Sequence, residues 1–145
     1  MVNKGRKRNS RLHRMDQKGR VAIPFSIRRD LRYGELLYLT KGLDPCIYVY
    51  TEEEWKKLIA RFEEASLGKT SVRKKIRKIM GEVEEVEIDP QGRIRIPSHL
   101  AQYAGLEDQC FFARMPRWFE IWNPEKYREY MEESKDEEEI EEFPL

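Results

Sequence analysis

Short segments in which apolar and polar residues alternate recur along the chain and predict β-strands. Residues 20–23 read RVAI and residues 93–96 read RIRI. A period of two is typical of a strand with one buried face. Residues 36–40 and 47–50 are rich in β-branched and aromatic residues and flank a Gly-Leu-Asp-Pro turn, which predicts a hairpin. The corresponding second hairpin is expected from residues 110–114 and 119–122.

Apolar residues at helical spacing follow each predicted hairpin. Thr51 and Glu54 form the pattern of a capping box, and Asn123 followed by Pro124 is a second helix-start signal. Ser71 is expected to cap a third helix, which has a basic outer face. The chain therefore predicts an α+β protein in which strands dominate.

The pattern arises from an internal duplication. Residues 15–27 read MDQKGRVAIPFSI and residues 88–100 read IDPQGRIRIPSHL, with Asp, Gly, Arg, Ile and Pro at the same places in both. We divide the chain accordingly. Residues 1–11 form a basic N-terminal arm, 12–65 a first unit, 66–82 a basic helical linker, 83–134 a second unit and 135–145 an acidic tail.

Each unit is too small to bury an adequate core by itself, since folded domains of about 45 residues usually need a staple or a partner. Cys46 and Cys110 have no metal-like or disulfide-framework spacing and are expected to be buried free thiols. The two units are therefore expected to pack on each other as one closed, pseudo-two-fold barrel with flanking helices, which leaves few exposed sheet edges.

Charge is segregated along the chain although the total is nearly balanced. The formal net charge is only +1, but residues 1–20 hold eight basic side chains against the single acid Asp16. Residues 132–142 are almost entirely acidic and contain a single basic residue, Lys135. This asymmetry indicates a basic working face and a repelling tail.

The turn sequence Asp-x-x-Gly-Arg-hydrophobic-x-Ile-Pro resembles the AbrB-like family of swapped-hairpin regulators and antitoxins. Two copies in one chain, with the segments KGLDPCIYVYTEEEW and FEIWNPEKYREYMEE, resemble the tandem-repeat MraZ family over residues 12–134. The resemblance implies two SpoVT/AbrB-like units in a swapped-hairpin barrel, and a ring-like homo-oligomer such as an octamer. It also implies a cytoplasmic, nucleoid-associated regulator that binds short repeated sites upstream of its own cell-division and cell-wall operon.

A comparison of the two copies locates the candidate DNA contacts. Lys18, Arg28 and Arg29 correspond to uncharged residues in the second copy, and Arg14 corresponds to Glu87. Basic side chains neutralise phosphates, and Arg also reads guanine edges. The AbrB-like pattern has basic residues at several of the same positions. The predicted contacts with double-stranded DNA are Arg14, Lys18, Arg20, Arg28 and Arg29, with Arg32 peripheral.

Alternatives remain open at these positions. Arg20 could serve the turn by pairing with Asp16, because the second copy keeps the same pair as Asp89 and Arg93. Arg28 and Arg29 could lie on a simply solvated helix face. The predicted structural residues of the turns are Asp16, Gly19, Asp89, Gly92 and Arg93.

Other classes of function find less support. No nucleophile and base pair, metal-ligand spacing, phosphate-binding glycine loop or long apolar run is present. We therefore expect no enzyme, cofactor, metal, small-molecule substrate or membrane partner. The main alternative is an AbrB-like antitoxin that binds a toxin and represses its operon, and a structural ring without a DNA role is another.

The two ends and the linker also keep several interpretations. The family resemblance implies an apolar, aromatic N-terminus, whereas residues 1–11 are basic, which fits a DNA-contacting arm, a lineage-specific start or added residues. The linker helix could contact DNA or another subunit, or be solvated. The acidic tail is expected to be solvated, or to screen the basic face.

Overall fold

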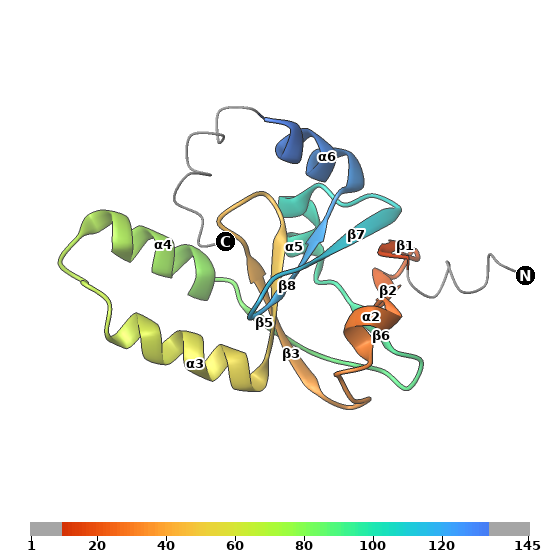
Figure 1. Ribbon diagram of the computed structural model, residues 1–145, viewed down its shortest axis with the longest axis horizontal. Coiled ribbons are helices and arrows are strands. Elements are labelled where there is room, and N and C mark those ends of the chain that lie inside the picture. Colours follow the sequence, from red (N-terminus) through yellow and green to blue (C-terminus); the bar gives the residue numbers. More distant parts are fainter. Residues whose placement is uncertain (1–9, 134–145) are drawn as a thin grey trace, which may run out of the picture.

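The computed structural model describes residues 10–133 (Figure 1). Most of the predicted basic arm and all of the acidic tail lie outside the described residues. The strands are β1 (Leu12–Arg14), β2 (Arg20–Ala22), β3 (Leu36–Lys41), β4 (Ile47–Thr51), β5 (Glu84–Glu87), β6 (Arg93–Arg95), β7 (Gln109–Arg114) and β8 (Phe119–Trp122). The helices are α2 (Phe25–Arg28), α3 (Glu52–Glu63), α4 (Thr70–Met80), α5 (Ser98–Ala104) and α6 (Pro124–Glu132).

The two copies share their strands instead of forming separate sheets. The large sheet has the order β1-β7-β8-β4-β3-β5, and β2 pairs with β6 in a separate two-stranded ribbon. β1 of the first copy pairs with β7 of the second, as the equivalent β5 pairs with β3. The first two strands of each copy, β1 and β2 or β5 and β6, thus pair with strands of the other copy.

A pseudo-two-fold axis relates the copies. Val21 is paired with its own equivalent Ile94, and Tyr48 is paired with its equivalent Glu120. A residue can face its equivalent in an antiparallel pair only on a two-fold axis, so the axis passes through both pairs. The α+β class and the packing of two units on each other are confirmed.

The closed barrel is not confirmed. Among residues 10–133 no strand ladder joins β2 to β1 or β6 to β5, so β1 and β5 remain edges of the large sheet. The ribbon is short because proline, which has no N–H to donate, follows closely at Pro24 and Pro97. In the first copy the ring of His13 also bonds to the carbonyl of Ala22, at 2.5 Å, and so occupies that acceptor.

The large sheet is buried on both faces by two apolar clusters. One face packs against the ribbon, α2 and α5 through aliphatic residues such as Ile23, Leu39 and Leu100. The other face carries an aromatic cluster that includes Trp55 and Trp122 and is covered by α3, α4 and α6. Strands β4 and β8 lie in the middle of the sheet and are therefore almost wholly buried.

Several local predictions are confirmed and one is wrong. The hydroxyl of Thr51 accepts a hydrogen bond from the Glu54 amide at 3.2 Å, although Glu54 does not complete the box, because its buried Oε1 has no partner. Asn123 caps α6 as expected. Ser71 does not cap α4, because the helix already begins at Thr70, after Lys69.

The cysteines and several aromatic side chains, among them Trp55, Phe119 and Trp122, lie in the interior. Cys46 and Cys110 are buried free thiols, as the sequence indicates. Burial raises the pKa of the Cys110 thiol to about 12. No helix within residues 10–133 combines the length and apolar character needed to cross a membrane.

Candidate nucleic-acid interface

The turn between β1 and β2 is organised around one carboxylate. Asp16 Oδ1 accepts hydrogen bonds from the amides of Lys18 and Arg20, each at 2.9 Å. Asp16 Oδ2 accepts from Arg20 Nε at 2.8 Å. Gly19 has a φ of 82°, a conformation that residues with a Cβ rarely adopt. The Arg20 amide, followed by the other hydrogen bonds from Arg20 and Lys18, lowers the pKa of Asp16 despite an opposing effect of desolvation.

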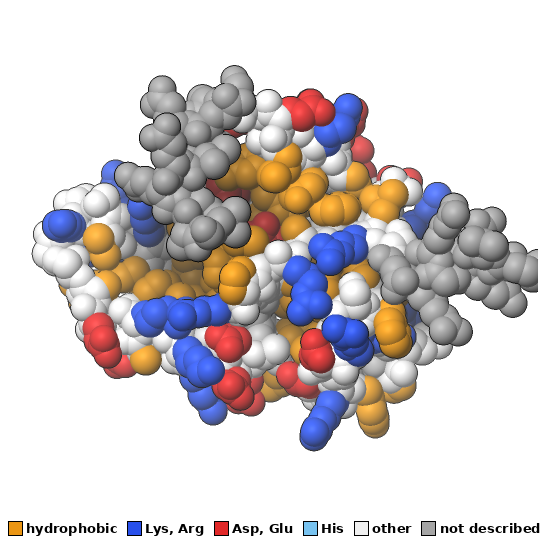
Figure 2. Space-filling view, viewed as in Figure 1, with side chains coloured by type: hydrophobic (Ala, Val, Ile, Leu, Met, Phe, Trp, Pro, Cys, Tyr) orange, Lys and Arg blue, Asp and Glu red, His pale blue; other side chains and the backbone are white. Residues whose placement is uncertain are grey.

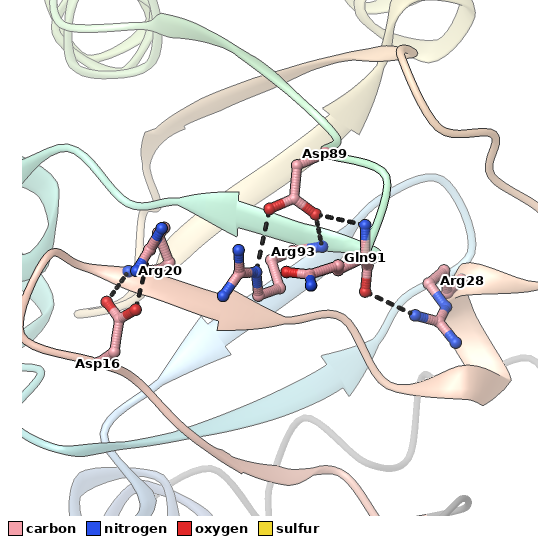
Figure 3. A network of polar contacts seen from close by, with 6 residues as sticks. All are labelled: Asp16, Arg20, Arg28, Asp89, Gln91 and Arg93. Carbon is pink, nitrogen blue, oxygen red and sulfur yellow. Dashed lines mark hydrogen bonds and ion pairs between the residues drawn. The ribbon is translucent and has the colours of Figure 1, made fainter.

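The second turn repeats this geometry (Figure 3). Asp89 Oδ1 accepts from the amides of Gln91 and Arg93 at 2.9 and 2.8 Å, and Oδ2 accepts from Arg93 Nε at 3.0 Å. Burial alone would raise the pKa of Asp89, but these hydrogen bonds outweigh it and the pKa lies below its ordinary value. Arg20 and Arg93 therefore both have a structural partner, and each keeps its outer guanidinium nitrogens for other contacts.

The ribbon places three arginines on its outer face. Arg20 pairs directly with Arg95 across the two strands, and Arg93 pairs with Ala22. Because Val21 and its partner are 1% exposed and point into the core, these side chains point outward. Two like charges placed directly opposite each other are unfavourable in a sheet unless a partner of opposite charge is present.

Arg28 extends this surface onto the second turn. Its Nη1 donates to the Gln91 carbonyl at 3.1 Å. The side chain lies so close to Gly92 that a Cβ at that position would meet the Arg28 guanidinium. Exposed Arg29 and Arg32 line a shallow groove with Arg28 and Gln91.

Lys18 lies at the opposite end of the ribbon, on the tip of the first turn. It lines another groove with Arg95 and the N-terminal part of α5. Together these residues form a continuous row, which we name the basic strip. The basic strip consists of Lys18, Arg20, Arg95, Arg93 and Arg28.

The predicted contacts all come from the first copy, and several of them lie against the second copy. Arg28 and Arg29 lie beside the second turn, while Lys18 lies beside the helix of the second copy. Arg14 is exposed on the edge strand β1, opposite Gln109. Sequence comparison missed Arg95. The alternation of residues 93–96 already placed it outside, but only the register brings it opposite Arg20.

The basic linker helix is not part of this surface. In Figure 1, α3 and α4 form a hairpin at one end of the long axis, while α2 and the ribbon lie toward the other. Some of its cations have partners within the chain. Arg73 donates to the Leu67 carbonyl at 2.8 Å, and the Lys78 ammonium lies 5.2 Å from the centre of the Tyr103 ring.

Residues 10–133 also hold no cluster of His, Cys, Asp or Glu placed to bind a metal ion. The described chain is thus a duplicated α+β protein whose two copies pair their strands with each other, with a row of cations along a two-stranded ribbon. This is the class of protein that fold and site define together.

Comparison with known proteins gives the family. The sequence profile of the family described as "MraZ protein, putative antitoxin-like" matches twice, over residues 8–78 and 79–143. The chain is also 42% identical over 118 residues to a protein of Caldanaerobacter subterraneus named "Transcriptional regulator MraZ", covering 81% of each chain. The chain belongs to the MraZ family, which confirms the resemblance found in its repeated motifs.

Proposed function

We propose that this protein is a transcriptional regulator that binds double-stranded DNA through the basic strip. The single observation that carries the proposal is the direct pairing of Arg20 with Arg95 on the outer face of the ribbon. The name of the Caldanaerobacter relative supports the regulatory role.

The chemistry of the strip suits a nucleic-acid backbone. Phosphate contacts release bound counterions and give affinity that falls with salt. A two-stranded ribbon is also narrow enough to enter the major groove, where an arginine can make two hydrogen bonds to a guanine. The bridges from Asp16 and Asp89 hold Arg20 and Arg93 in place before binding, which reduces the entropy lost in the complex.

The residues of the strip have different roles in this proposal. Within residues 10–133 Arg95 forms no ion pair with a carboxylate, so it supplies free charge. Arg28, Arg29 and Arg32 extend the contact at the second turn, and Lys18 and Arg14 extend it at the first. A DNA site with repeated elements would suit several copies of the strip, which a ring-like homo-oligomer would bring to the DNA at once.

The target that we propose is the DNA upstream of the protein's own operon. The experiment is fluorescence anisotropy with this duplex and with a scrambled duplex of equal length and composition, over a series of salt concentrations. We expect tighter binding to the operon duplex and an affinity that falls steeply with salt. Equal binding to both duplexes would contradict sequence-specific regulation, and absence of binding at low salt would contradict a DNA-binding role.

An antitoxin role is less well supported. Such a protein needs a segment that binds its toxin after a single hairpin unit, whereas here residues 84–122 complete the sheet of the first copy. The strands of the second copy are therefore committed to the fold, and a regulator without a toxin partner is the simpler proposal.

A further inference from the structure

A second feature lies away from the basic strip and does not rest on the proposed function. An open cavity of about 660 Å³ lies between the helical hairpin α3–α4 and the loop that joins β7 to β8. Its wall is mostly apolar and includes Leu58, Phe62, Ile79 and Trp118. Figure 2 shows apolar side chains exposed beside α3 and α4 with Lys and Arg side chains close by.

The charged side chains that line this cavity all have one sign. Arg61 comes from α3, Lys75 from α4 and Arg117 from the loop after β7, and no carboxylate belongs to the lining. Arg61 and Arg117 are exposed. An apolar cavity with only cations around it fits an occupant that has apolar side chains and negative charge.

The C-terminal sequence of the chain has this composition. Residues 136–142 read DEEEIEE and are followed by Phe143, Pro144 and Leu145. Six carboxylates thus flank or precede three large apolar side chains, Ile140, Phe143 and Leu145. The apolar side chains of such a segment gain free energy when they leave water.

Helix α6 brings the chain close to the cavity before this segment begins. The hydroxyl of Tyr130, in the last turn of α6, donates to Asp44 Oδ1 at 2.9 Å. Leu43, the neighbour of Asp44, lines the cavity, and the Asp44 carboxylate also accepts from the cavity residue Tyr48 at 3.4 Å. An extended chain spans about 3.3 Å per residue, so the segment from residue 134 onward is long enough to reach across the opening.

We propose that residues 136–145 dock onto this cavity in the same chain. Phe143 and Leu145 enter the apolar part, and the carboxylates lie against Arg61, Lys75 and Arg117. The acidic tail then covers an apolar surface at the end of the molecule remote from the ribbon, and does not screen the basic strip.

The test uses the full chain with p-benzoylphenylalanine in place of Phe143. Illumination should attach this residue to the cavity lining, with Met115 and Ile79 as expected sites, and mass spectrometry of the digested protein locates the attachment. Illumination of a mixture of isotopically light and heavy protein separates attachment within a chain from attachment between chains. Products within one chain at the cavity support the proposal.

Matched variants test the role of charge. Arg61→Glu on α3 should lower the yield severalfold, whereas Lys56→Glu on the same helix, outside the cavity, should leave it unchanged. High salt should reduce the yield in the unmodified protein, because exposed charge pairs are screened. Attachment outside the cavity or equal yields in both variants would overturn the proposal. Products that join a light and a heavy chain would also overturn it, because they would mean that a second copy occupies the cavity.

Discussion

Arg28 donates a hydrogen bond to the backbone carbonyl of Gln91, a residue 63 positions away in the other copy of the repeat. The contact exists because β2 pairs with β6, which places the second turn beside α2. The second turn favours glycine for two reasons. Gly92 has a φ of 75°, and a Cβ there would lie 2.0 Å from the Arg28 guanidinium.

A substitution at this glycine should therefore depend on Arg28. Gly92→Ala should lower the free energy of unfolding by about 1–2 kcal/mol, because a left-handed conformation is strained for a residue with a Cβ. In an Arg28→Ala background the cost should be smaller, since the displaced guanidinium is gone. Chemical denaturation of the two single variants and the double variant measures the difference.

The first turn supplies the control. Gly19 has a φ of 82°, but its neighbours are backbone atoms and Arg95, not Arg28. The cost of Gly19→Ala should be the same with and without Arg28→Ala. If Gly92→Ala showed no dependence on Arg28 either, the close approach would have no energetic consequence.

The turn carboxylates give a defined dependence of stability on pH. The pKa values of Asp16 and Asp89 lie below their ordinary value, so each stabilises the fold when ionised. That stabilisation is fully present above the unfolded pKa of about 3.9 and is lost as pH falls through the lower folded value. Asp89→Asn should therefore be destabilising at neutral pH, and its difference from the wild type should shrink below about pH 4.

Thermal unfolding of the wild type and Asp89→Asn between neutral and acidic pH measures this effect. Asp108→Asn is a suitable control, because Asp108 is an exposed aspartate outside both turns. A difference between wild type and Asp89→Asn that stays constant across the range would contradict the role of the carboxylate.

Glu120 should give the opposite dependence of stability on pH. Burial raises its pKa, despite hydrogen bonds from the indoles of Trp122 and Trp118 at 2.8 and 3.0 Å that lower it, and nearby Asp44 raises it further. A raised folded pKa means that the charged form costs stability at neutral pH. The wild type should gain stability relative to Glu120→Gln as pH falls toward the unfolded pKa of a glutamate.

At neutral pH, Glu120→Gln changes two contributions to the free energy of unfolding at once. It removes a buried charge, but a single amide oxygen can serve only one of the two indoles well, which costs about 1 kcal/mol. The pH dependence of the difference, not its absolute size, is therefore the informative measurement. If the wild type instead lost stability relative to Glu120→Gln as pH fell, Glu120 would be stabilised in its ionised form.

The sequence was sufficient where the determining contacts are local. The turn residues Asp16 and Gly19 and the caps Thr51 and Asn123 act within a few positions, so their patterns predict their geometry. The wrong prediction of a cap at Ser71 also concerns local structure, because α4 already begins at Thr70, one residue before Ser71.

The other features of the fold and of the candidate site depend on contacts between segments that are distant in the sequence. The size of each unit predicts that the copies must pack together, but not that β1 would pair with β7, nor that the ribbon would stay separate from the large sheet. The position of Arg95 opposite Arg20 requires the register of that ribbon. The cavity beside α3 and α4 depends on how the linker helix packs, which no repeat in the sequence specifies.

If the outer face of the ribbon binds DNA, the Arg95→Ala variant should bind DNA more weakly. Arg95 is exposed and faces Arg20, so its removal should leave the fold intact. Arg128→Ala on α6, a helix that contributes no residue to the basic strip, removes the same charge and serves as the control. The measurement is the salt dependence of affinity for the operon duplex, by anisotropy, for the wild type and both variants.

We expect Arg95→Ala to weaken binding and to reduce the slope of log affinity against log salt by about 0.9, the effect of one lost phosphate contact. Arg128→Ala should match the wild type in affinity and slope. If both variants bind as the wild type does, the ribbon is not the DNA-binding surface. If both lose affinity equally, binding depends on overall charge and not on the basic strip.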